Sequence, residues 1–146
     1  MDDDVLNKHP DIVIIYIGVN DVWHKKSTGT GTDADKFEKF YQAILKKLSD
    51  KKIKAILCTP AVIGEKTDFS NELDKDLDLY CNIIRDIAAK NKLPIVDLRK
   101  AFLEYNLKNN KSNKDAGILT ADRVHLNDQG NQLVAEKIWE VLKIIK

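Results

Sequence analysis

The sequence predicts an α/β fold in which a parallel sheet lies between layers of helices. Three short runs of apolar, mostly β-branched residues are spaced along the chain, and amphipathic helical patterns lie between and after them. Nearly unbroken apolar runs of this kind are typical of strands buried on both faces in a parallel sheet. With 146 residues, the chain is expected to form a single domain, residues 1–146. The alternation of strands and helices implies right-handed crossover connections.

The elements can be placed in order. The expected strands are residues 11–18, 54–59 and 93–98, and residues 2–10 resemble the end of a preceding helix. Helical spacing of apolar residues predicts four helices, which begin near Thr32, Ser70, Lys100 and Asn127. Ser70 and Asn127 are good N-cap residue types, and Thr32 with Asp35 resembles a capping box.

Loops are expected at the carboxyl ends of the three strands. They cover residues 19–32, 60–70 and 99–125. In open α/β sheets, ligands bind at this edge. The functional residues should therefore lie in these three segments.

The composition is that of an ordinary globular chain without a strong net field. Hydrophobic residues make up 43% and charged residues 32%, the net charge is +1, and lysines alternate with acids along the helical patterns. Neither nucleic acid nor an anionic membrane is therefore expected as a partner. No apolar stretch approaches the roughly 20 residues that span a bilayer, and the acidic start MDDDVLNKHP does not resemble a signal peptide. For this stretch of chain a cytoplasmic location is the expectation, while that of the parent protein stays open.

No cofactor and no metal site are predicted. Cys58 and Cys81 lie in apolar patterns without a metal-binding spacing, so both are expected to be reduced and buried. The glycines of STGTGT, residues 27–32, are too few and too far from the first strand to cradle a phosphate, which argues against a dinucleotide site. A flavin-binding protein would suit the architecture but not the loop chemistry.

The first motif that could carry chemistry is an acid and an imidazole three residues apart. Asp122 and His125 precede the last helix. Asp122 can accept a hydrogen bond from one ring nitrogen of His125, which fixes the tautomer and leaves the other nitrogen free as a general base. Taken alone, the pair fits better as a surface feature at a helix start.

The second motif is GVND, residues 18–21, at the end of the first strand. Gly18 allows the backbone to turn sharply there. Asn20 then projects from the following loop, and its amide can donate hydrogen bonds to a developing oxyanion. The competing interpretation is a strand-ending turn in which Asn20 and Asp21 bond their own backbone.

Together, and in this order, the two motifs resemble the SGNH (GDSL-type) hydrolase family. Gly18, Asn20 and Asp21 match the third block of the family; Asp122 and His125 match the fifth, within GILTADRVHLNDQGNQLVAEKI. The resemblance covers residues 4–146. It implies a flavodoxin-like three-layer α/β/α sandwich with lipase, esterase or acyl-hydrolase activity on a small acyl ester.

The resemblance also implies the roles of these residues. His125 would be the base and then the acid, Asp122 would orient it, and Asn20 would hold the oxyanion, with Gly18 as a further candidate donor. Family members begin with a strand that ends in Gly-Asp-Ser, whose serine is the nucleophile. A helix, a second strand and a glycine-bearing loop follow that serine. This sequence contains no Gly-Asp-Ser and begins near the helix that precedes the GVND strand.

No other residue is expected to replace that serine. The serines are Ser27, Ser49, Ser70 and Ser112. Ser27 comes nearest, but a nucleophile on a flexible loop would lack the positioning that catalysis needs. We therefore expect an N-terminally incomplete, inactive portion of an ester hydrolase; the alternative is a non-catalytic α/β binding or assembly module derived from this fold. Without the first strand of the family, residues 11–18 would be an exposed edge, which predicts self-association, as a symmetric dimer.

Overall fold

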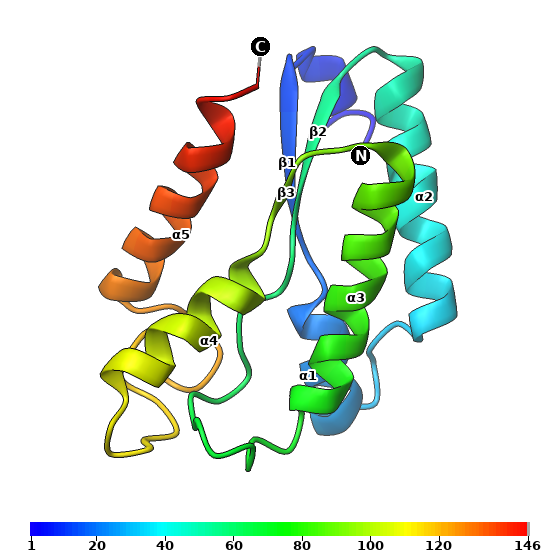
Figure 1. The fold of residues 1–146 in the computed structure, drawn as a ribbon. Helices are drawn as coiled ribbons and strands as arrows, with labels where there is room; N and C mark the ends of the chain where they lie inside the picture. Colours follow the sequence, from blue (N-terminus) through cyan, green and yellow to red (C-terminus); the bar gives the residue numbers. More distant parts are fainter. Residues whose placement is uncertain (146) are drawn as a thin grey trace.

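The three apolar runs form a parallel sheet with helices on both faces (Figure 1). The structure is a computed structural model that describes residues 1–145. Its elements, in chain order, are a 3₁₀ helix η1 (Leu6–Lys8), β1 (Ile12–Tyr16), α1 (Val19–Ser27), α2 (Ala34–Asp50), β2 (Lys54–Cys58), α3 (Asp74–Asn91), β3 (Ile95–Val96), α4 (Leu98–Asn109) and α5 (Asp128–Leu142). The predicted α/β class and the three predicted strands are confirmed.

The strands lie in the order β1-β2-β3, all parallel, so their carboxyl ends meet at one edge of the sheet. Ile12 pairs with Lys54 and Tyr16 with Cys58 along β1 and β2. The segments that follow the strands gather at this edge, at the bottom of Figure 1, together with the connection between α4 and α5. The sequence therefore placed the candidate functional loops at the correct edge.

Alternate side chains of β2 enter two different cores. Ala55 and Leu57 pack with α2 and α3, whereas Ile56 and Cys58 pack with residues of α4 and α5. This follows from the two-residue period of a strand. Figure 1 shows α2 and α3 on one side of the sheet and α5 on the other, as a three-layer sandwich requires.

The expectation that the first strand is buried on both faces is wrong. Ile15 is buried, but Ile14 and Tyr16 are each 38% exposed and the following Ile17 is 40% exposed. The reason is that β1 is an edge strand of the described sheet and that α5 packs against β3 at the other edge.

The segment 19–32 is not a loop throughout, because α1 occupies its first nine residues. Gly18 precedes α1 with a φ of 116°, a conformation that favours glycine. Asp21 lies in the first turn of α1 and Lys25 and Lys26 in its last, so their charges complement the helix dipole. Only Val22 is buried in α1, which leaves little periodic signal in the sequence.

Two of the expected helix starts are displaced. The N-cap of α2 is Asp33, without a side-chain cap, rather than a Thr32 capping box. The helix expected after Ser70 begins only at Asp74, because the Asp68 carboxylate accepts hydrogen bonds from the Ser70 amide and hydroxyl at 3.1 and 2.6 Å.

The last two helices agree better with the predicted positions. Asp97 caps α4 by accepting a hydrogen bond from the Lys100 amide at 3.2 Å, so α4 starts two residues earlier than expected, and β3 is correspondingly short. The Asn127 side chain accepts a hydrogen bond from the Gly130 amide at 2.9 Å, which confirms the predicted cap of α5.

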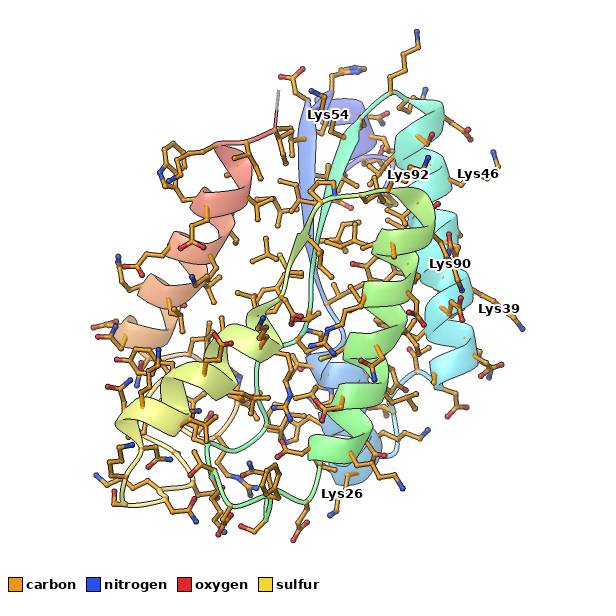
Figure 2. The ribbon with its side chains drawn as sticks, in the orientation of Figure 1. Lys26, Lys39, Lys46, Lys54, Lys90 and Lys92 are labelled. Carbon is orange, nitrogen blue, oxygen red and sulfur yellow. The ribbon has the colours of Figure 1, made fainter. Side chains whose placement is uncertain are left out.

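The lysines lie on the outer surface of the helices. Figure 2 shows Lys39 and Lys46 pointing outward from α2. Within α2, Lys39 pairs with Asp35 and Lys46 with Asp50. Lys90 of α3 pairs with Glu38 of α2. Among residues 1–145, no helix is both long and apolar enough to cross a membrane.

Candidate active site

Asp122 and His125 form a hydrogen-bonded pair between α4 and α5. The Asp122 Oδ2 and His125 Nδ1 atoms are 2.6 Å apart. The other carboxylate oxygen of Asp122 accepts hydrogen bonds from the backbone amides of His125, at 2.8 Å, and Val124, at 3.1 Å. The hydrogen bond from the His125 ring, followed by those from the two amides, lowers the pKa of Asp122 to about 2. The carboxylate is thus ionised at neutral pH and can hold the proton of His125 on Nδ1, with Nε2 free to accept another.

The pair lies in a tightly folded segment, residues 117–127, which we call the acid–base turn. The Ala121 amide donates to the His125 carbonyl at 2.8 Å, and the hydroxyl of Thr120 accepts from the Arg123 amide at 3.1 Å. Thr120 and Leu126 form an antiparallel bridge that closes the turn. Arg123 has a φ of 86°, which is strained for a residue with a side chain and is held by these surrounding bonds.

The helix α1, which carries Asn20, contacts the His125 ring through Trp23. The Trp23 ring meets the His125 ring edge-on, with centroids 5.6 Å apart and an interplanar angle of 82°. Asn20 lies three residues before Trp23 and so projects from the same face of α1, and it is exposed. Asn20 thus starts a helix rather than projecting from a loop, and the helix fixes its direction. No hydrogen bond joins it to the pair within residues 1–145.

Gly18, the second oxyanion candidate, is buried at the start of α1. A Cβ atom there would come within 3.0 Å of Pro60 Cγ and 3.3 Å of Phe37 Cζ, in addition to the strain of its positive φ. Its glycine identity is therefore required by the turn and by close packing. Asp21 has a structural role: its carboxylate accepts a hydrogen bond from the Thr32 amide at 3.2 Å.

Ser27 shares a cleft with Asp122. This cleft, of about 220 Å³, is also lined by Trp23 and Leu73. Its hydroxyl, however, donates to the Trp23 carbonyl at 3.0 Å, within α1. The Ser70 hydroxyl is bound to Asp68, and Ser49 and Ser112 lie at the end of α2 and in the turn after α4. None of the four hydroxyl groups forms a hydrogen bond with His125 in the described part of the chain.

The two thiols are free and buried, as the sequence predicted. Burial raises the pKa of Cys58 to about 11 and that of Cys81 to about 12. Both thiols are therefore protonated at neutral pH and unsuited to nucleophilic attack. Within residues 1–145, no cluster of three or more His, Cys, Asp or Glu side chains could hold a metal ion.

Comparisons with known proteins identify the family and the fold. The model of the GDSL-like lipase/acylhydrolase family matches residues 1–133. The crystal structure of an acetyl xylan esterase, AlAXEase, superposes with a TM-score of 0.95 at 63% identity, over 99% of this chain and 72% of that one. An acetylxylan esterase of Geobacillus stearothermophilus is 30% identical over 139 residues, which are 92% of this chain.

The acetylxylan esterase Axe2 of the same organism has also been solved. Its structure superposes with a TM-score of 0.83 at 25% identity, over 99% of this chain and 64% of that one. Other structures of Axe2 are of catalytic mutants in which a serine, a histidine or an aspartate is replaced by alanine. This chain spans 60% of the length of the acetylxylan esterase of Geobacillus stearothermophilus. From the match of the family model over most of its length, the chain belongs to the GDSL-like lipase/acylhydrolase family.

Proposed function

We propose that the protein is the acid–base portion of a serine esterase that removes acetyl groups from xylan-type sugars. The observation that carries the proposal is the 2.6 Å hydrogen bond between Asp122 and His125, on the edge of the sheet that also carries Asn20. Asp122 orients His125 as a general base, and the Asn20 amide is the donor that the proposal assigns to the oxyanion.

The reaction would proceed in two acyl-transfer steps. A serine hydroxyl gives its proton to His125 Nε2 while its oxygen attacks the acetyl carbonyl, and the Asn20 amide stabilises the resulting oxyanion. His125 then returns the proton to the sugar oxygen as the ester bond breaks, leaving an acetyl-serine. Water, deprotonated by His125, attacks the acetyl-serine, and acetate leaves with the serine restored.

The relatives support the choice of substrate and of catalytic groups. Two of the matched proteins are named as acetylxylan esterases, one of them at 63% identity. In the Axe2 mutants, the replaced aspartate and histidine are three positions apart, the same spacing as Asp122 and His125.

We infer that the serine belongs to a Gly-Asp-Ser segment encoded before Met1 and that residues 1–146 alone are inactive. Two observations on the described residues support this inference. None of the four serine hydroxyl groups forms a hydrogen bond with His125, and burial raises the pKa of both thiols. Loss of the nucleophile from a serine triad leaves only the weak catalysis of binding and oxyanion stabilisation.

The test uses the protein extended upstream of Met1 to include Gly-Asp-Ser. It should release acetate from acetylated xylan, and His125→Ala should reduce that release by at least about 10³-fold. A stop codon directly upstream, or an extended protein without esterase activity, would favour a non-catalytic binding or assembly module. Activity mainly on long-chain esters would refute the proposed substrate alone.

We further propose that residues 1–146 alone self-associate through β1, as a symmetric dimer. The supporting observations are that β1 ends the described sheet and that Ile14, Tyr16 and Ile17 are each 38–40% exposed beside it. Edge strands with apolar side chains tend to pair with another chain.

A further inference from the structure

Glu65 has a buried carboxylate that faces the acid–base turn. It lies in the connection between β2 and α3 and is only 1% exposed. One oxygen accepts hydrogen bonds from the amides of Leu119, at 2.5 Å, and Thr120, at 2.8 Å, and the other accepts from the amide of Ile118, at 2.8 Å. No cation pairs with Glu65 among residues 1–145, so this carboxylate is used entirely on the backbone of one segment.

The three amides are consecutive, and this determines the shape of the segment. Successive amides of an extended strand point in opposite directions, so three in a row can reach one carboxylate only if the chain curls around it. The curl ends at Thr120, two residues before Asp122. Thr120 itself is fully buried, and its hydroxyl holds the Arg123 amide.

The backbone next to Glu65 reinforces the same contact. The Gly64 amide donates to the Arg123 carbonyl at 2.8 Å, and the Glu65 amide donates to the Asp115 carbonyl at 3.0 Å. The Arg123 side chain in turn binds the Asp115 carboxylate, with Nε and Oδ2 2.8 Å apart. Residues 64 and 65 therefore hold the chain at three places. These are Asp115, just before the acid–base turn, the curl at residues 118–120, and Arg123, between Asp122 and His125.

We propose that Glu65 is a positioning residue: by binding the amides of residues 118–120, it sets the geometry of the Asp122–His125 pair. The inference rests on the proposed role of His125 as the general base. Asp122 binds the His125 ring, and the Ala121 amide binds the His125 carbonyl. If the curl loosens, both groups move relative to His125. The carboxylate thus acts on catalysis through the turn and does not touch the substrate.

The test compares Glu65→Gln and Glu65→Ala with the unaltered chain by NMR of the His125 ring nitrogens and the Asp122 carboxyl carbon. Gln can retain one acceptor atom and Ala retains none, so the effect should increase from Gln to Ala. We expect the Nδ1-protonated tautomer of His125 to lose its dominance. We also expect the pKa of Asp122 to rise from about 2 towards 3.8 as the hydrogen bond from His125 weakens.

Asp97→Asn is the matched control, because it also converts a structural carboxylate into an amide. Asp97 accepts hydrogen bonds from Thr59, Arg85 and Lys100, all outside the acid–base turn. The Asp97→Asn variant should have a lower melting temperature but unchanged NMR signals of His125 and Asp122. If Glu65→Ala does not fold, the NMR signals of Glu65→Gln can still be compared with those of Asp97→Asn, and that comparison tests the role of Glu65.

The proposal is overturned if folded Glu65→Gln keeps the signals of the unaltered pair, or if Asp97→Asn changes them equally. The measurement needs no turnover. The NMR result therefore does not depend on whether the esterase proposal holds. If the Glu65 variants keep the signals of the unaltered chain, only the role of Glu65 is refuted.

Discussion

The acid–base turn and the strand β1 are built in opposite ways. In the turn, residues 117–127, backbone and side-chain groups bind one another and Glu65, so the Asp122–His125 pair has a defined geometry. Along β1, Ile14 and Tyr16 leave apolar surface exposed at the edge of the described sheet. The difference separates a segment whose geometry is set by its own contacts from a strand whose exposed apolar side chains remain open to further packing.

The largest effect on activity should come from breaking the Asp122–His125 pair in the protein extended upstream of Met1 to include Gly-Asp-Ser. Asp122→Asn should lower kcat about 10⁴-fold, because an amide can hold His125 in the wrong tautomer while leaving the ring in place. The measurement is kcat for p-nitrophenyl acetate. Asp86→Asn, on α3, is the control and should keep the parent rate. A loss below about tenfold for Asp122→Asn would mean that another group orients the base.

The oxyanion half should be the next most sensitive. Asn20→Ala in the same protein should lower kcat about 10²–10³-fold, the usual effect of removing one donor. Alanine favours helices, so α1 should persist, and KM should change little. Steady-state kinetics with circular dichroism separates these effects. An unchanged kcat would exclude Asn20 as a donor and leave the Gly18 amide as the candidate.

Association through β1 can be prevented without altering the Asp122–His125 pair. Residues 1–146 should form a dimer at tens of micromolar in light scattering, and Ile14→Lys should yield a monomer, because a charge on an edge strand opposes pairing. Leu107→Lys is the control: Leu107 is 59% exposed but lies on α4, so its replacement should leave the dimer intact. A monomer for the unaltered chain would contradict association through β1.

The smallest effect concerns the pH dependence of the pair. The pKa of Asp122 is lowered from 3.8 to about 2, so its stabilising contribution is complete above about pH 4 and is lost as the pH falls towards 2. Carboxyl NMR titration should show this transition. In His125→Ala the pKa should move back towards 3.8, because the hydrogen bond from the His125 ring is the largest cause of the shift. An unchanged pKa would assign the shift to the backbone amides.

Local patterns in the sequence predicted the three strands, the alternation of strands and helices along the chain and the cap of α5. The Asp122–His125 pair was predictable for the same reason, since a spacing of three residues brings its groups together within one turn. The helix α1 was missed because Gly18 and the helix dipole stabilise it, with only one buried residue to produce a periodic pattern.

The contacts between distant segments could not be predicted. Glu65 meets Thr120 across 55 positions, and a single glutamate in a loop carries no pattern that would indicate this contact. The packing of Trp23 against His125 could not be predicted either, because it depends on how α1 and the acid–base turn meet at the edge of the sheet.

The central claim is that residues 1–146 hold an acid–base pair without the nucleophile that it serves. The most direct test compares p-nitrophenyl acetate hydrolysis by this chain and by its His125→Ala variant at equal concentration. The account predicts equal rates, close to the background. Clearly faster hydrolysis by the unaltered chain would contradict it, because His125 would then be activating a nucleophile within these residues.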